Sequence, residues 1–413
     1  MKVLAYTSPA RGHLNPMMGP LLELRRRGAE VHVRTLASGV EAVRDAGLEC
    51  EPIDPAIEAL AMDDHRARSQ KAAGERAFEV WAERAPIEVA DFGAALEAVR
   101  PDLALVDTTT FGARALAERE GLPWAESRPF LLEDPAPGVP PFGFGLRPKG
   151  GPLGRLRDGA FGLVLSQFDK RARLPTVNAG RDAAGLAPLA RIGEARSRAA
   201  LTIYFTAEPF EYPRQLPPGV LMVGAATWDP PAELPLEIPA DGRPLALVTL
   251  SSEFQDDSAI AAAALEGMSD RWRLVVTSAG VDPASLPRHG DAVVERYLPH
   301  RPLLERAAVV VCHGGMGIVQ KALAHAVPVC VVPWGRDQLD VAAHVEGAGA
   351  GVRLPRRRLS PARLAEAAAA AEGCAPGAAR VKAGYEAAGG DSTAADALES
   401  LAAGESPISR SRK

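Results

Sequence analysis

Short apolar runs alternate with segments of helical period along most of the chain. Residues 2–7 and 30–35 are rich in aliphatic and β-branched side chains and predict buried strands. Between them, apolar residues recur at helical spacing over 14–22, and Asn15 followed by Pro16 is typical of a helix start. The order strand, helix, strand predicts a parallel sheet with helices on both faces.

The second half repeats this pattern after a proline-rich stretch. Nine prolines occur from residue 209 to residue 244, where no periodicity is visible, as in an interdomain linker. Apolar runs at 245–251, 308–312 and 327–332 then predict a second parallel sheet. We therefore expect domains at 1–215 and 244–385, a linker at 216–243, a further helix at 386–404 and a disordered tail at 405–413.

The composition is that of an ordinary globular protein. The chain has 413 residues, 47% of them apolar and 24% charged, and its length requires more than one core. A net charge of −5 without a long basic run gives no reason to expect nucleic acid. No apolar run reaches membrane-spanning length and no signal peptide is evident, so we expect a cytoplasmic protein without a membrane span. The four cysteines are far apart and fit reduced thiols.

A glycine-rich turn follows the apolar run at 308–312. Gly314, Gly315 and Gly317 let backbone N–H groups approach a ligand closely, and a predicted helix N-terminus behind them offers unpaired donors. Together with His313, this turn predicts a site for a phosphate or a diphosphate. A tight turn without a ligand is the structural alternative.

Polar side chains also follow two other strands of the second half. Asp337 and Gln338 come after the run at 327–332, next to Trp334, and a carboxylate beside an amide suits the hydroxyls of a sugar. Asp337 as a simple helix cap is the alternative. Thr249 and Ser251 end the run that begins this half, where their hydroxyls could donate to phosphate oxygens or serve only the turn.

In the first half, His13 and Asp107 are the candidate catalytic residues. His13 follows one predicted strand near a helix N-terminus, and Asp107 ends another at 101–107. Because parallel strands share one carboxyl edge, Asp107 could accept from the ring of His13, while the positive helix end favours a neutral imidazole. A packed histidine and an N-cap aspartate are the alternatives. The absence of a GxGxxG motif argues against a dinucleotide-dependent dehydrogenase.

A stretch dense in proline and glycine, 133–154, predicts an irregular loop. Phe130, Phe142 and Phe144 lie in or beside it and could form an apolar wall for an acceptor. A disordered connection is the alternative.

These motifs resemble the nucleotide-sugar signature of the GT-B glycosyltransferases of the UDP-glucuronosyltransferase-like family, which includes enzymes of plant and bacterial secondary metabolism. The resemblance runs over nearly all of the chain and rests on Gly12-His13-Leu14-Asn15-Pro16, Asp107, His313, Gly314, Gly315, Gly317, Asp337 and Gln338. It implies an α/β fold of two Rossmann-like domains facing a cleft, with the acceptor in the first and the nucleotide sugar in the second. It also implies that His13 is the catalytic base, that Asp107 pairs with it, and that the C-terminal helix returns to the first domain.

The resemblance assigns a nucleobase site as well and exposes one departure. Tyr297 and Leu298 match the turn whose aromatic ring stacks on the base, although tyrosine offers less π surface than the family's tryptophan. The family usually has an acidic ribose ligand eight positions after the motif histidine, whereas this chain has Lys321, preceded by Gln320. A lysine cannot accept a ribose hydroxyl proton, so either Gln320 substitutes or the donor is a deoxyribose nucleotide.

The sequence thus predicts an inverting glycosyltransferase that moves a sugar from a dTDP- or UDP-sugar to a hydroxyl of a lipophilic natural product. No Asp-x-Asp motif is present, so we expect no metal ion and no cofactor beyond the nucleotide-sugar co-substrate. A monomer and a homodimer are both compatible with the sequence. The alternatives are an NDP-sugar 2-epimerase, which needs several carboxylates in the cleft, and a non-catalytic partner protein, which would need neither His13 nor Asp107.

Overall fold

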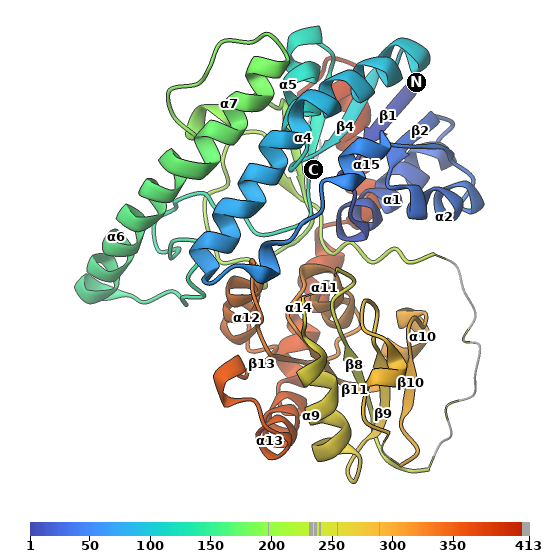
Figure 1. Ribbon diagram of the computed structural model, residues 1–413, viewed down its shortest axis with the longest axis vertical. Coiled ribbons are helices and arrows are strands. Elements are labelled where there is room, and N and C mark those ends of the chain that lie inside the picture. The colour runs from blue at the N-terminus through green and yellow to red at the C-terminus, as the bar shows by residue number, and fades with distance from the viewer. Residues whose placement is uncertain are drawn as a thin grey trace.

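The computed structural model contains two parallel β-sheets, one in each half of the molecule, with helices packed against both (Figure 1). It describes residues 1–196, 198–230, 234, 238, 241–253, 255–288 and 290–406. The tail expected at 405–413 therefore lies mostly outside the described residues, as do several positions of the expected linker.

The first sheet has seven strands in the order β3-β2-β1-β4-β5-β6-β7. All five residues of its central strand β4 are buried. Apolar and polar residues do not alternate along such strands, because helices cover both faces of a parallel sheet. The strands are β1 (Lys2–Tyr6), β2 (Glu30–Thr35), β3 (Glu49–Pro52), β4 (Leu103–Asp107), β5 (Trp124–Arg128), β6 (Leu201–Tyr204) and β7 (Val220–Met222).

The second sheet has six strands in the order β10-β9-β8-β11-β12-β13. Its neighbouring strands β8 and β9 are likewise buried along their whole length. The apolar runs that predicted a second sheet thus correspond to strands in the structure. The strands are β8 (Leu245–Thr249), β9 (Arg273–Thr277), β10 (Val293–Glu295), β11 (Ala307–Cys312), β12 (Val329–Val331) and β13 (Gly351–Arg353).

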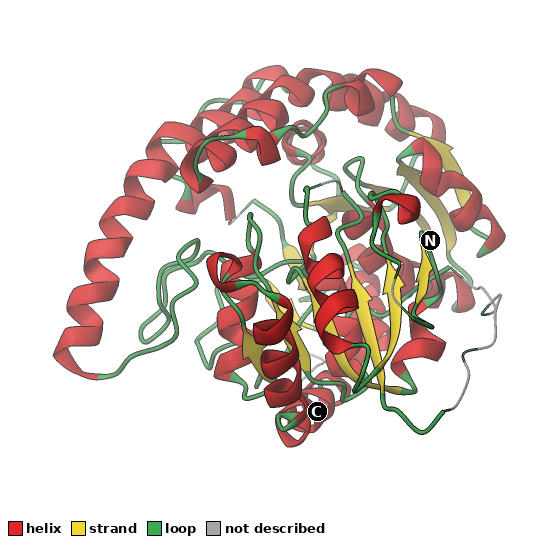
Figure 2. Cartoon of the chain, turned by 60° about the horizontal axis from the view of Figure 1, so that its bottom comes forward, coloured by secondary structure: helices red, strands yellow, loops and turns green. Residues whose placement is uncertain are grey.

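Helices flank the strands of each sheet (Figure 2). Among the described residues, none is both long and apolar enough to cross a membrane. In the first half they are α1 (Arg11–Arg26), α2 (Val40–Asp45), α3 (Pro55–Ala59), α4 (Gln70–Val99), α5 (Phe111–Glu120), α6 (Gly151–Phe168), α7 (Leu174–Ala183) and α8 (Gly193–Arg196). In the second half they are α9 (Ser258–Met268), α10 (His300–Leu304), α11 (Met316–Ala324), α12 (Gln338–Gly347), α13 (Pro361–Glu372), α14 (Ala375–Ala387) and α15 (Gly390–Ala402).

Helix α1 begins earlier than its proline pattern indicated. Ala10 is the N-cap, and both Pro16 and Pro20 lie inside the helix, so Asn15 is not a cap. The expectation of a helix start at Asn15 was therefore wrong, because the preceding loop already has helical geometry. As a result, His13 lies in the first turn of α1.

The last helix, α15, packs against α1. Arg27, directly after α1, bonds through Nη1 to Oδ1 of Asp396 at 2.6 Å and to Oε2 of Glu399 at 2.8 Å. The two helices approach closely, since a Cβ on Gly19 would lie only 2.2 Å from Oδ1 of Asp391. The chain thus ends against the first sheet after building the second.

Both sheets have a reversal of strand order at their first strand. The chain moves outward from β1 to β2 and β3, then returns to the other side of β1 with β4, and β8, β9, β10 and β11 repeat this path. Ligands of α/β proteins bind in the crevice that such a reversal leaves at the carboxyl ends of the strands. His13 and Asp107 lie at the first reversal, and Ser251 and His313 at the second.

Candidate active site

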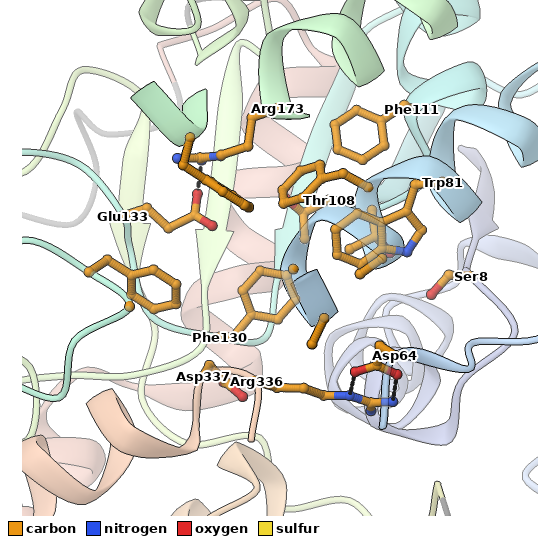
Figure 3. Close-up of a pocket in the computed structure, with 18 of the residues that line it drawn as sticks. Ser8, Asp64, Trp81, Thr108, Phe111, Phe130, Glu133, Arg173, Arg336 and Asp337 are labelled. Atoms are coloured by element: carbon orange, nitrogen blue, oxygen red, sulfur yellow. Dashed lines mark hydrogen bonds and ion pairs between the residues drawn. The ribbon is translucent and has the colours of Figure 1, made fainter. Parts of the chain in front are cut away.

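A cavity of about 990 Å³ opens beside the first strand-order reversal (Figure 3). Loops after β1, β4 and β5, helix α4 and parts of the 133–150 loop line it. The second half of the molecule contributes Glu253, Arg336 and Asp337. A volume of this size suits a polycyclic small molecule rather than a short metabolite.

The cavity contains a close histidine–aspartate pair. Nδ1 of His13 lies 2.6 Å from Oδ2 of Asp107, which is fully buried. The other carboxylate oxygen, Oδ1, accepts from both N and Oγ1 of Thr109 at 2.6 Å. Thr110 rather than Asp107 is the N-cap of α5. Because Asp107 fixes Nδ1 as the donor of a neutral ring, Nε2 is the nitrogen left to accept a proton.

The carboxylate also controls the basicity of the ring. Burial by itself lowers the pKa of His13, but the charge and the hydrogen bond of Asp107 outweigh burial, so the net pKa is raised. Glu253 acts in the same direction, and Arg336 opposes it. We had expected the helix N-terminus to keep the ring neutral, whereas the larger influence is Asp107. The deprotonated imidazole is therefore a stronger proton acceptor than an isolated histidine.

Asp337 and Gln338 are neighbours in the sequence but are placed differently. Asp337 is the N-cap of α12, yet its side chain makes no capping hydrogen bond and lines the cavity with His13. Burial raises the pKa of Asp337. Gln338 is buried, and its Oε1 accepts from N of Trp334 at 2.7 Å and from N of Gly335 at 2.9 Å. The carboxylate is thus available to a ligand, while the amide oxygen shapes the turn.

The rest of the Gln338 amide joins two strand ends. Its Nε2 donates to Oε1 of Gln255 at 2.8 Å, and Nε2 of Gln255 donates to Oγ of Ser251 at 2.8 Å. The ring of Trp334 lies 3.8 Å from the guanidinium carbon of Arg356 and packs against the core of the second sheet. Trp334 is not among the residues that line the cavity, so a direct sugar contact by its ring is not supported.

The candidate diphosphate residues meet at the second reversal. Thr249 of β8 pairs in register with Cys312 of β11, so Ser251 and His313 follow adjacent strands. The hydroxyl of Thr249 makes only a 3.4 Å contact with the next carbonyl oxygen. The hydroxyl of Ser251 accepts from Gln255 and keeps its own proton for a further acceptor. These hydroxyls lie beside the start of α11.

Two of the three glycines of this turn, Gly314 and Gly315, are required by the space around them. Gly314 has a φ of +96°, and a Cβ there would lie 2.7 Å from Cγ1 of Val331. A Cβ on Gly315 would lie 2.5 Å from Nε2 of His313, whereas one on Gly317 would meet nothing within 4 Å. Helix α11 has neither a side-chain cap nor an acidic residue in its first turn. Its first N–H groups are therefore free to bind an anion.

His313 is a neutral histidine. Burial and the charge of Arg336 lower its pKa to about 4, against a hydrogen bond to the backbone of Thr249. Its Nδ1 is buried without a hydrogen-bond partner, and the nearest carboxylate, Oδ2 of Asp257, is 3.7 Å away. A buried nitrogen of this kind next to an open helix N-terminus is a favourable position for a polar ligand atom.

The two residues assigned to the nucleobase differ in exposure. The side chain of Tyr297 is 63% exposed, so its ring is free to stack on a base. Leu298 is buried in the core of the second sheet. The side chain of Leu298 is therefore not free to contact a ligand.

Gln320 does not have the free amide that ribose binding would need. It is buried, its Oε1 accepts from N of Ala226 at 3.1 Å, and its Nε2 donates to the carbonyl oxygen of Phe205. Its polar atoms join α11 to the segments that cross between the sheets. Lys321 instead pairs its ammonium with Asp229. The carboxylate of Asp229, close to the position where the family carries an acid, is thus engaged by this ammonium.

Phe130, Phe142 and Phe144 line the cavity. The ring of Phe130 meets that of His13 edge to face, with centroids 5.6 Å apart. A second group of rings was not predicted from the sequence. This aromatic cluster comes from α4, α5 and α6, and α4 contributes two of its rings three residues apart, a spacing that could have indicated a shared face. Its members are Phe78, Trp81, Phe111 and Phe168.

The loop after β5 is anchored to the second half of the molecule. N of Gly143 and N of Gly145 donate to the two carboxylate oxygens of Asp340 at 2.9 and 3.2 Å. Nη1 of Arg353 donates to the carbonyl oxygen of Gly145 at 2.9 Å. Burial raises the pKa of Asp340 to about 6, although both loop N–H groups oppose this shift. One carboxylate of α12 therefore positions the loop that carries two phenylalanines of the cavity.

Arg336 forms a second contact between the halves, visible at the edge of the cavity (Figure 3). Its Nε and Nη2 donate to the carboxylate of Asp64 at 2.9 Å each, and its Nη1 donates to Oε2 of Glu253 at 2.6 Å. A bidentate pair of this geometry fixes both partners. Neither pattern nor spacing in the sequence indicated it, because Asp64 and Arg336 are 272 positions apart.

Two Rossmann-like sheets with polar strand ends facing one cavity are the architecture of the GT-B glycosyltransferases. The chain belongs to the natural-product glycosyltransferases of the UDP-glucuronosyltransferase-like family, which transfer sugars from nucleoside-diphosphate sugars. Residues 274–388 match the family described as erythromycin biosynthesis protein CIII-like, C-terminal domain. The chain is 32% identical over 378 residues to 4'-demethylrebeccamycin synthase of Lentzea aerocolonigenes, covering 87% of this chain and 89% of the relative.

Solved structures share the fold over the whole chain. The glycosyltransferase of kitacinnamycin superposes with a TM-score of 0.73 at 22% identity, covering 97% of this chain and 98% of that one. Glycosyltransferase VinC in complex with dTDP gives a TM-score of 0.69 at 23% identity, covering 98% and 100%. These likenesses establish the GT-B fold of the protein.

Proposed function

We propose that the protein is an inverting glycosyltransferase that moves a hexosyl group from a dTDP- or UDP-sugar to a hydroxyl of a lipophilic natural product. The observation that carries this proposal is the 2.6 Å pair of His13 and Asp107 in a cavity that Asp337 also lines. The pairing of Lys321 with Asp229 supports a dTDP donor, because the ammonium offers no acceptor for a ribose hydroxyl.

The catalytic step follows from this pair. Nε2 of neutral His13 removes the hydroxyl proton of the acceptor while its oxygen attacks the anomeric carbon. The bond from this carbon to the diphosphate oxygen breaks, the electron pair leaves with the diphosphate, and direct displacement inverts the anomeric centre. Asp107 stabilises the imidazolium that forms, and Asp337 orients the sugar through its hydroxyls.

The leaving diphosphate would be held at the second reversal. Its contacts are the free N–H groups at the start of α11 and the hydroxyls of Thr249 and Ser251, with the imidazole of His313 beside them. Donors fixed in advance stabilise charge that develops in the transition state without reorganisation. Because the protein supplies these donors itself, we propose that turnover needs no metal ion and persists in EDTA.

The decisive test is His13→Ala, assayed with dTDP-glucose and UDP-glucose against a panel of aromatic and macrocyclic alcohols. We expect the rate to fall roughly 10²–10⁴-fold, the usual contribution of a general base. Stabilisation by dTDP should remain, and His32→Ala, a change outside the cavity, should behave as wild type. NMR of the product should show the inverted anomer. A near-normal rate would refute the assignment, and wild type without any nucleotide response would favour a non-catalytic partner.

A further inference from the structure

The cavity has two ends of different character (Figure 3). In this view Phe130 lies between Asp337 and Arg336 on one side and Thr108 and Glu133 on the other. The first side holds the groups whose charges act on the catalytic histidine. A bound acceptor therefore presents its reacting hydroxyl at this end and extends past Phe130 toward the other.

The far end is built to hold a flat aromatic ring system. In the aromatic cluster, Phe78 meets Trp81, Phe168 and Phe111 with ring centroids 4.8, 5.6 and 6.4 Å apart. The first two contacts are edge to face, so both faces and edges of the cluster are presented. Such arrays favour a further π system over an aliphatic group, because ring quadrupoles prefer complementary faces and edges.

Charged side chains border this aromatic end. We call Arg114, Glu126, Arg128 and Glu133 the charged row, and all four line the cavity. Nη2 of Arg114 lies 2.6 Å from Oε2 of Glu126, and Nε of Arg128 lies 3.1 Å from Oε1 of the same carboxylate. Burial raises the pKa of Glu126, but the two guanidiniums outweigh it and the net pKa is lowered, so this carboxylate is ionised.

Two donors of the charged row lack a hydrogen bond, Nε of Arg114 and Nη1 of Arg128, and the second belongs to the guanidinium beside Phe130. Nη1 of Arg128 is buried without a partner, and the nearest oxygen of Glu133 is 3.8 Å away. The guanidinium is otherwise fixed by Glu126, by Oγ1 of Thr108 at 3.2 Å and by the ring of Phe130, 5.5 Å from its carbon. Buried polar groups are normally satisfied, and an exception on the wall of a ligand cavity points to a ligand atom.

We infer, on the basis of the proposed function, that the acceptor is a planar polycyclic aromatic compound with a carbonyl-type oxygen away from its reacting hydroxyl, and that Arg128 donates to this oxygen. The charged row balances two guanidiniums with two carboxylates, and Arg173, which pairs with Glu133, is balanced in turn by Asp169. A neutral carbonyl therefore suits it better than a carboxylate, which would add an uncompensated buried charge. Arg128 is a specificity-determining residue in this arrangement, remote from the proton transfer.

Two matched probes test the inference. 2-(Hydroxymethyl)anthraquinone and 2-(hydroxymethyl)anthracene share a flat three-ring frame and a neutral alcohol, and only the first has carbonyl oxygens. In calorimetric titrations of wild type, the anthraquinone should bind about tenfold more tightly, as expected for a hydrogen bond from a charged donor. The perhydro form of the anthracene probe should bind more weakly than either. Equal affinity for both flat probes, or undiminished binding of the perhydro form, would overturn the inference.

The variant Arg128→Lys keeps the charge but removes the guanidinium fork. It should bring the affinities of the two flat probes within about threefold, chiefly by weakening anthraquinone binding. The matched control is Arg181→Lys, because Arg181 is similarly buried and pairs with Glu118 at 2.6 Å but does not line the cavity. If a folded Arg128→Lys protein prefers the anthraquinone to the anthracene as strongly as wild type does, Arg128 does not donate to the carbonyl oxygen of the acceptor. If that variant does not fold, the comparison of probes on wild type decides.

Failure of the inference and failure of the proposed function give different results. An intact donor site is seen as thermal stabilisation by dTDP or UDP, which needs no acceptor. Loss of probe discrimination with normal nucleotide binding would refute only the acceptor class. Probe binding as expected, without nucleotide binding or sugar transfer, would refute the glycosyltransferase mechanism instead.

Discussion

The two strand-order reversals of the protein share one topology and differ in chemistry. At the first, β4 ends in Asp107, and this carboxylate raises the pKa of His13. At the second, the equivalent strand β11 ends in Cys312, and burial lowers the pKa of His313 to about 4. The two histidines follow different strands of the shared topology, β1 and β11, and the carboxylate at the end of β4 raises the pKa of the first while burial lowers that of the second.

The second reversal does contain a carboxylate, that of Asp257, but its hydrogen bond is to a backbone N–H group and not to His313. Oδ2 of Asp257 accepts from N of Ser251 at 2.9 Å and lies 3.7 Å from Nδ1 of His313. Burial raises the pKa of Asp257, which reduces its ability to stabilise an imidazolium. Under the proposed function, the placement of carboxylates separates proton transfer at the first reversal from anion binding at the second.

Removing the carboxylate from the first reversal should have the largest effect. Asp107→Asn should lower kcat roughly 10²–10³-fold, because the ring loses its fixed tautomer. Wild-type kcat/KM should fall as the pH drops through the raised pKa of His13, since only the neutral ring accepts a proton. Without the carboxylate that pKa falls, so the acid limb of the profile should move to lower pH. Asp102→Asn, outside the cavity, is the control, and an unmoved limb would contradict the assignment.

A side chain that crowds the second reversal should weaken binding of the nucleotide-sugar donor and have less effect on His13. Gly315→Ala places a Cβ 2.5 Å from Nε2 of His313 in the present geometry, so the imidazole or the turn must shift. We expect dTDP to bind about 10–100-fold more weakly by calorimetry, since several backbone donors are displaced together. Gly159→Ala, where a Cβ meets nothing within 4 Å, is the matched control. Unchanged dTDP affinity would mean that the diphosphate is bound elsewhere.

Changing Asp340, whose hydrogen bonds join the two halves near the acceptor, should have a smaller effect on probe binding, and this effect should depend on pH. Asp340→Asn replaces one of two acceptor oxygens by a donor facing the N–H groups of Gly143 and Gly145. At about pH 7.5 we expect the anthraquinone probe to bind roughly 3–10-fold more weakly. At about pH 5 wild-type Asp340 is mostly protonated, because its pKa is about 6, and the difference should narrow. A pH-independent difference would exclude ionisation of Asp340 as the cause.

The smallest effect concerns the ribose. Wild type should bind dTDP at least as tightly as UDP, because Asp229 holds the ammonium of Lys321. Combining Lys321→Glu with Asp229→Asn provides an acceptor without a like-charge neighbour and should improve UDP binding relative to dTDP by about 3–10-fold. Each single variant shows how much nucleotide binding changes when the ion pair of Lys321 and Asp229 is broken. An unchanged ratio in a folded double variant would show that position 321 does not contact the ribose.

The strand-end residues of both reversals were predictable, because apolar runs mark where strands stop and parallel strands stop at one edge. His13, Asp107, His313 and Asp337 were found in this way. The amides were not: Gln338 bonds to Gln255, 83 positions away, and Gln320 to Ala226, 94 positions away. The two amides form their hydrogen bonds with backbone groups and side chains that lie far away in the sequence, and no local sequence pattern indicates such partners. The rings that α4 and α5 contribute to the aromatic cluster were missed because no local pattern joins residues of different helices.

The path of the chain connects the two halves more than once. The polypeptide leaves the first sheet after β7, builds the whole second sheet, and returns as α15 to pack on α1. In topological terms the second half is an insertion into the first, connected to it at two points. The ion pair of Arg336 with Asp64 adds a further connection at the edge of the cavity, so any relative movement of the halves that separates these side chains must break it.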